Sequence, residues 1–116
     1  MRLTQLNHLV PEEDAVYNQL TSAQIERLAI LSEELGEAQQ IVGKILRHGF
    51  MSYNPFDINK VPNQLLLTKE LGDVLYAVKL LQANGEMLIS DIEEFSKQKE
   101  FKIKSYLHHN SGDINV

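Results

Sequence analysis

Two pairs of carboxylate residues are the side chains in this sequence best suited to chemistry. They are Glu34 with Glu37 and Glu70 with Asp73, and each pair is spaced three positions apart. Residues three apart share one side of a helix, and on a helical wheel each pair falls inside or at the edge of an arc of apolar residues. Burying an ionised carboxylate is costly, and converging carboxylates also repel each other. The pattern therefore predicts a positive group among them.

Protonation, pairing with a basic residue or a bound metal ion can supply that positive charge. Arg27 shares the wheel face of Glu34, but it neutralises one acid at best. Ligation by carboxylates alone favours Mg²⁺ or Mn²⁺ over zinc. Di-iron bundles use Glu-x-x-His, and no glutamate of this chain has a histidine three positions later. Glu-x-x-Glu is most often a solvated helix face, but two such pairs on consecutive helices inside apolar arcs favour the metal site.

The first acidic pair belongs to a helix whose start and end are both marked in the sequence. Thr21 and Gln24 form a capping box. Apolar residues then follow at steps of three and four positions: Ile25, Leu28, Leu31, Leu35, Ala38, Val42 and Ile45. We expect the helix to end near Arg47 to Gly49. Residues 50–63 hold two of the three prolines and form the next connection, and loops of this length are usually functional or mobile.

The second acidic pair belongs to a helix for which Asn63 is the expected N-cap and Asn84-Gly85 the expected stop. A further helix is expected from Ser90 to about Leu107, followed by a polar tail, 108–116, and a short helix is expected to start at Pro11. The alternation typical of strands is absent. The sequence thus predicts an all-α fold in a single domain, 1–116, with a core of about 22–107.

Composition limits the function classes further. The 116 residues, 43% of them hydrophobic, suffice for one domain with a buried core. The absence of cysteine excludes disulfides, zinc-thiolate sites and cysteine nucleophiles, and favours a cytoplasmic protein. No apolar run approaches the roughly 20 residues that span a membrane, and the N-terminus lacks a signal-peptide pattern. The net charge of −5 argues against direct binding of nucleic acids and for cations as partners.

The acidic pairs also resemble a known family signature. Glu33-Glu34-Leu35-Gly36-Glu37, followed later by Glu70-Leu71-Gly72-Asp73, is similar to the paired E-E-x-x-E and E-x-x-D motifs of the MazG-like, all-α nucleoside triphosphate pyrophosphohydrolases. Lys44-Ile45-Leu46-Arg47-His48-Gly49, and Asn63 opening the helix of Lys69-Glu70-Leu71-Gly72-Asp73, resemble a compact branch of the family often found in phages. The resemblance covers about residues 22–83, and the gap between Glu37 and Glu70 is slightly longer than usual.

This resemblance implies a compact bundle of about four helices that assembles as a dimer or tetramer. It implies hydrolysis of the α–β phosphoanhydride of a nucleoside triphosphate, yielding a monophosphate and pyrophosphate. Glu34, Glu37, Glu70 and Asp73 would hold Mg²⁺, with Mn²⁺ as the alternative, because phosphoryl chemistry needs charge neutralisation and an aligned water. Glu33 is the candidate catalytic residue that orients or deprotonates this water; equally, it is an ordinary exposed glutamate.

The remaining candidate site residues would bind substrate. Lys44 lies about 10 Å along the helix from Glu37, a distance that a triphosphate covers, and Arg47 suits a bidentate phosphate contact. The alternative for both is a favourable cation at a helix C-terminus. Asn63 contacts substrate or only caps its helix, and Tyr76 reaches the nucleoside or lies at a subunit interface.

Two other functions remain open at this point. One is a pyrophosphohydrolase for a different nucleotide, of the phosphoribosyl-ATP type. The other is a non-catalytic helical interaction protein, against which the complete set of four acids argues. Release of pyrophosphate with Mg²⁺ that stops when EDTA is added separates the enzymes from the interaction protein.

Overall fold

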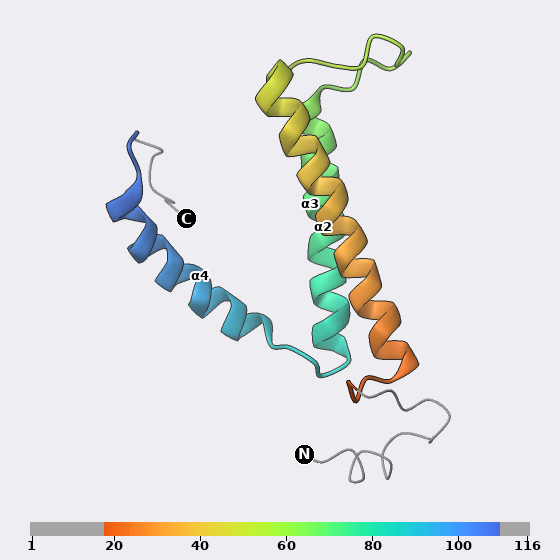
Figure 1. Ribbon diagram of the computed structural model, residues 1–116, viewed down its shortest axis with the longest axis vertical. Helices are drawn as coiled ribbons and strands as arrows, with labels where there is room; N and C mark the ends of the chain where they lie inside the picture. Colours follow the sequence, from red (N-terminus) through yellow and green to blue (C-terminus); the bar gives the residue numbers. More distant parts are fainter. Residues whose placement is uncertain (1–17, 110–116) are drawn as a thin grey trace.

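The computed structural model describes residues 18–109, and all regular secondary structure in this part of the chain is helical (Figure 1). It contains α2 (Ser22–His48), α3 (Asn63–Ala83), α4 (Ile89–Ile103) and the short 3₁₀ helix η2 (Lys104–Tyr106), with no strand among these residues. The predicted all-α class is therefore confirmed for this part. The helix expected from Pro11 and residues 110–116 of the expected tail lie outside the described residues.

The ends of helix α2 are set by a capping box at its start and a glycine at its end. The Thr21 hydroxyl accepts from the backbone N–H of Gln24 at 3.1 Å, and the Gln24 side chain accepts from the N–H of Thr21 at 2.9 Å, which completes the predicted capping box. Gly49 ends the helix with a φ of 93°, a backbone conformation that glycine adopts without steric cost. The basic residues Arg47 and His48 occupy the last turn, where the helix dipole favours them.

Helix α3 begins differently from the prediction. Pro62 is the N-cap, and Asn63 is the first helical residue, so its side chain does not cap the helix. Asn63 is instead buried, and its Nδ2 donates to the backbone oxygen of Gly49 at 3.2 Å. The amide thus ties the start of α3 to the end of α2. Asn84 and Gly85 end α3 as expected, with Gly85 at a φ of 74°.

Helices α2 and α3 form an antiparallel hairpin, and the core lies between them (Figure 1). Among the described residues the buried apolar side chains are Ala38, Ala77 and Leu81, the last two only 1% exposed. At the end near the α3–α4 turn, the Arg27 guanidinium donates to both carboxylate oxygens of Glu86, at 2.7 and 2.8 Å. This bidentate pair joins α2 to the residues that follow α3.

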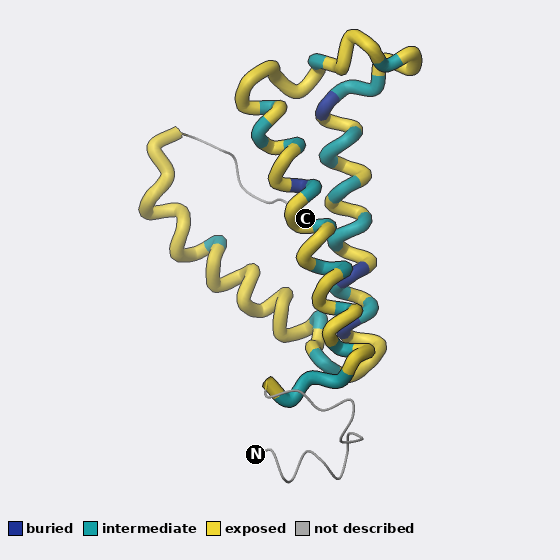
Figure 2. The backbone as a smooth tube through the Cα atoms, turned by 45° about the vertical axis from the view of Figure 1, so that its right-hand side comes forward, coloured by how far each residue is buried: buried dark blue, intermediate teal, exposed yellow. Residues whose placement is uncertain are grey.

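Helix α4 leaves the hairpin and buries none of its residues (Figure 2). It starts one residue before the predicted Ser90, and the last turn of the predicted helix is the 3₁₀ helix η2. Large apolar side chains on it, such as Phe95 and Phe101, are exposed. The Cα radius of gyration is 19.2 Å, compared with about 13 Å for a closely packed chain of 100 residues. None of the helices within 18–109 is long and apolar enough to cross a membrane.

Candidate metal centre

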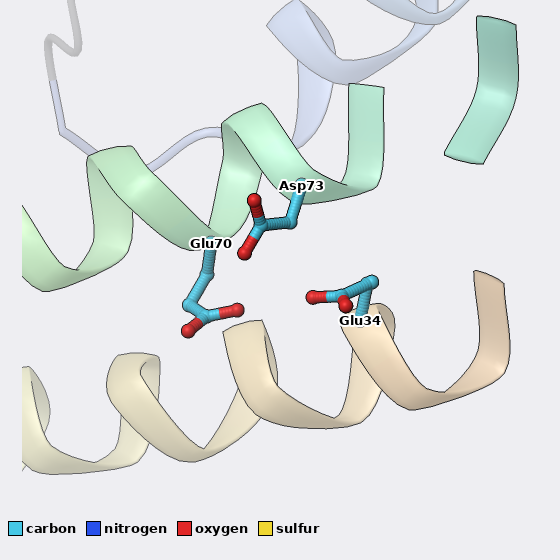
Figure 3. A group of neighbouring side chains, drawn as sticks. All are labelled: Glu34, Glu70 and Asp73. Atoms are coloured by element: carbon cyan, nitrogen blue, oxygen red, sulfur yellow. The ribbon is translucent and has the colours of Figure 1, made fainter. Parts of the chain in front are cut away.

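Three carboxylates from both hairpin helices meet at mid-length of the hairpin (Figure 3). Glu34 points from α2 toward Glu70 and Asp73 on α3, and one oxygen from each lies within 4.8 Å of the other two. All three residues are partly buried. The convergence follows from the spacing of the acids, because residues three or four apart on each helix face the partner helix together.

Glu37 lies beside this group without belonging to it. Its carboxyl is hydrogen-bonded to that of Glu70, and this bond raises the pKa of Glu37, because two carboxyl groups can share a hydrogen bond only when one is protonated. The charges of Glu70 and Glu34 act in the same direction. Of the four predicted ligands, three are therefore close enough to share one ion, and the fourth contacts the set through Glu70.

The cluster leaves buried oxygen atoms without hydrogen-bond partners. These are Oε2 of Glu34 and Oε2 of Glu70. Burial is the main cause that raises the pKa of Glu34, followed by the negative charges of Asp73 and Glu70. Buried polar atoms in native proteins nearly always have partners. A hard cation among these oxygens would satisfy both atoms and relieve the repulsion, so the donor set fits Mg²⁺ or Mn²⁺.

Lys69 supplies a positive charge that the sequence interpretation missed. Its Nζ lies 2.9 Å from Oδ2 of Asp73 and 3.5 Å from Oε1 of Glu70, and these contacts raise the pKa of Lys69. The Lys69 side chain is 65% exposed, whereas that of Glu70 is 14% exposed. The ammonium therefore sits on the solvent side of the cluster and does not occupy its buried side. The i, i+4 spacing of Lys69 and Asp73 in the sequence could have predicted this ion pair.

Arg27, considered above as a partner of Glu34, does not reach the cluster. Both of its hydrogen bonds go to Glu86, and they hold the pKa of Glu86 below its usual value. Glu33 is exposed, but its charge contributes to the raised pKa of both Glu34 and Glu37, so it lies near the cluster. Tyr76 is exposed on α3.

The predicted substrate-binding residues other than Tyr76 meet in a cavity at the loop end of the hairpin. Lys44, Arg47 and Asn63 line it, and its volume is about 300 Å³. The structure adds residues that sequence reasoning did not single out, from the connection 49–62 and from the first turns of α3: Ser52, Tyr53, Asn54, Pro55, Asp57, Val61 and Leu66. Only the clustering of prolines and asparagines in this connection signalled a shaped loop. We call this cavity the loop pocket.

Comparison of the chain with family models, curated proteins and solved structures finds no match. The chemistry of the site therefore rests on the arrangement of its own residues.

Proposed function

We propose that this protein is a Mg²⁺-dependent pyrophosphohydrolase that cleaves nucleoside triphosphates or their deoxy forms between the α and β phosphates. The observation that carries the proposal is the meeting of Glu34, Glu70 and Asp73 around two buried oxygens without hydrogen-bond partners. Acids that served only as a solvated helix face would point outward and keep their oxygens in water. The similarity of the acidic motifs to the MazG-like signature supports the same reaction.

Glu34, Glu70 and Asp73 would hold the ion, with Glu37 supporting Glu70. When bound, Mg²⁺ would supply neutralisation of phosphate charge and a more acidic water molecule. Glu33 is exposed beside the ligands, where its carboxylate can orient an attacking water or take up its proton. Lys44 and Arg47 line the loop pocket and offer donors to phosphate oxygens. The chain's own contribution is thus to place anionic ligands and cationic phosphate contacts along one hairpin.

We further propose that the chain functions as a dimer or tetramer. Leu28, Leu35 and Val42 follow one another at seven-residue intervals on α2 and all remain exposed. This spacing aligns them along one side of the helix, as in coiled-coil seams. Leu71 and Leu75 of α3 are exposed as well. Extended apolar surfaces of this kind usually mark interfaces, and a second hairpin packed on the first would give a four-helix bundle.

The direct test is release of pyrophosphate from a panel of common and modified nucleoside triphosphates, with Mg²⁺ and with EDTA. We expect a monophosphate and pyrophosphate in equal amounts with Mg²⁺, and no reaction with EDTA. Including phosphoribosyl-ATP in the panel tests the alternative substrate class. Turnover of none of these compounds by a folded, Mg²⁺-saturated protein would reject the proposal and favour the non-catalytic interaction protein.

A further inference from the structure

The lining of the loop pocket is chemically mixed. Lys44 and Arg47, from the last turns of α2, contribute cationic groups, and His48 and Asp57 contribute an imidazole and a carboxylate. Tyr53, Val61 and Leu66 contribute aromatic and aliphatic surface to the same cavity. A volume of about 300 Å³ lies at the lower end of small-ligand sites. The pocket therefore suits a ligand that joins one flat, partly apolar ring to an anionic group.

The wall of the pocket is built by backbone hydrogen bonds that hold the loop in place. The N–H of Asn63 donates to the oxygen of Ser52, and that of Gln64 donates to the oxygen of Phe50, both at 2.8 Å. Within the loop, the Asp57 carboxylate accepts from the N–H groups of Asn59 and Val61, both at 3.0 Å. The shape of the cavity is thus present before any ligand binds, which lowers the entropic cost of binding.

The pocket and the acidic cluster are separated by a distance that one nucleotide can span. Asn63 in the pocket and Glu70 in the cluster are seven positions apart on α3, which is about 10 Å along a helix. Lys44 and Glu37 have the same separation on α2. A nucleotide with its phosphates at the cluster can therefore extend its nucleoside toward the loop.

We propose that the loop pocket binds the nucleoside end of the substrate and that Tyr53 stacks on its base. The inference rests on the proposed function for the direction of the phosphates. Tyr53 is the tyrosine among the residues that line the pocket and offers a larger ring than the imidazole of His48, and stacking on an aromatic ring is available to every nucleobase. The Lys60 ammonium lies 5.9 Å from the centroid of the Tyr53 ring, which helps to fix the ring's position.

The test uses binding without turnover. AMP, GMP, CMP, UMP and dTMP are titrated calorimetrically into the full chain in EDTA, with inorganic phosphate as a separate probe. We expect at least one monophosphate to bind more tightly than phosphate and to shift the NMR resonances of the Tyr53 ring. Tyr53→Ala should weaken that binding about tenfold or more, the loss expected for one base–aromatic stack, whereas Tyr53→Phe should retain it. Tyr106→Ala, an exposed tyrosine beyond α4, is the matched control and should not change binding.

Three results would overturn the inference: no monophosphate binds, phosphate binds as tightly as the nucleotides, or Tyr53→Ala binds as the parent does. If circular dichroism shows that Tyr53→Ala is unfolded, the test is whether the monophosphates shift the Tyr53 ring resonances of the parent protein. Pyrophosphate release by the parent with Mg²⁺ is measured in parallel. Release of pyrophosphate without Tyr53-dependent binding would reject nucleoside binding in the loop pocket but leave the proposed enzyme activity standing. Tyr53-dependent binding without release of pyrophosphate would support the pocket and reject the proposed activity.

Discussion

The ammonium of Lys69 lies 2.9 Å from Oδ2 of Asp73, on the same helix and four positions away. A metal ion that uses Asp73 as a ligand must share that carboxylate with Lys69 or displace the ammonium. The exposed position of Lys69 leaves its side chain room to move into water. Lys69 would therefore compete with a metal ion for the Asp73 carboxylate.

Lys69→Met should bind Mg²⁺ more tightly than the parent. Exposed ion pairs of this kind contribute little free energy, so the dissociation constant for Mg²⁺ should fall by only about two- to fivefold. Calorimetric titration of Mg²⁺ into both proteins measures the change. Lys79→Met, an exposed lysine on the same helix, is the matched control and should leave the affinity unchanged. Unchanged or weaker binding by Lys69→Met would show that the ammonium does not compete.

Glu37→Gln should stabilise the metal-free fold and slow the proposed reaction. The introduced amide can donate to the Glu70 carboxylate at any pH, so it keeps the hydrogen bond of Glu37 and removes its charge. The melting temperature without metal should rise, and kcat of the proposed reaction should fall about ten- to a hundredfold, the usual loss when a residue that supports a metal ligand is changed. Glu93→Gln on α4 is the control. Pyrophosphate release at the parent rate would remove Glu37 from the site.

Asp73→Asn should abolish the proposed turnover, and its metal-free stability should increase less than that of Glu37→Gln. This change relieves repulsion within the cluster and at the same time removes the ion pair with Lys69. Thermal melts in EDTA of Asp73→Asn and Glu37→Gln compare the two effects directly. A larger gain for Asp73→Asn than for Glu37→Gln would contradict the assigned partners of these acids.

The stability of the metal-free protein should fall with rising pH in one pH range and with falling pH in another. Glu34 and Glu37 have raised pKa values in the fold, so the folded state binds more protons and stability falls as pH rises from about 4.3 through the raised values. The lowered pKa of Glu86 contributes stability that is lost as pH falls below that point. Saturating Mg²⁺ favours ionised ligands, so the gain in melting temperature from Mg²⁺ should grow with pH. A gain that does not vary with pH would argue against carboxylate ligation.

Asn63→Ala should destabilise the hairpin at its loop end. The side chain is 5% exposed, and the change removes its hydrogen bond to the backbone oxygen of Gly49. The free energy of unfolding should fall by about 0.5–1.5 kcal/mol, the usual net contribution of one hydrogen bond. Asn84→Ala removes a comparable bond, from Nδ2 to the oxygen of Leu80 at 2.9 Å, at an exposed site, and it should cost clearly less. Equal losses in urea denaturation would show that Asn63 is not an anchor.

How much of this arrangement was predictable depends on the range of the interactions involved. The capping box of Thr21 and Gln24 and the inward direction of Glu34 and Glu70 depend only on helical periodicity, so the sequence sufficed. The partner of Arg27 was not predictable, because Glu86 is reached only after α3 returns along α2. The same holds for Asn63, whose amide bonds to Gly49 across the loop. Tyr53 enters the pocket because the loop path is set by bonds between distant backbone groups.

The backbone bonds from Asn63 to Ser52 and from Gln64 to Phe50 join main-chain atoms at both ends of the connection. Main-chain donors and acceptors do not depend on which side chains stand between them. We therefore expect the two helices to keep their register, and Glu34 to face Glu70, when residues 53–56 are exchanged. If the loop pocket binds the nucleoside as proposed, ligand preference can diversify in this one short stretch without disturbing the acids, and the connection is the place to engineer selectivity.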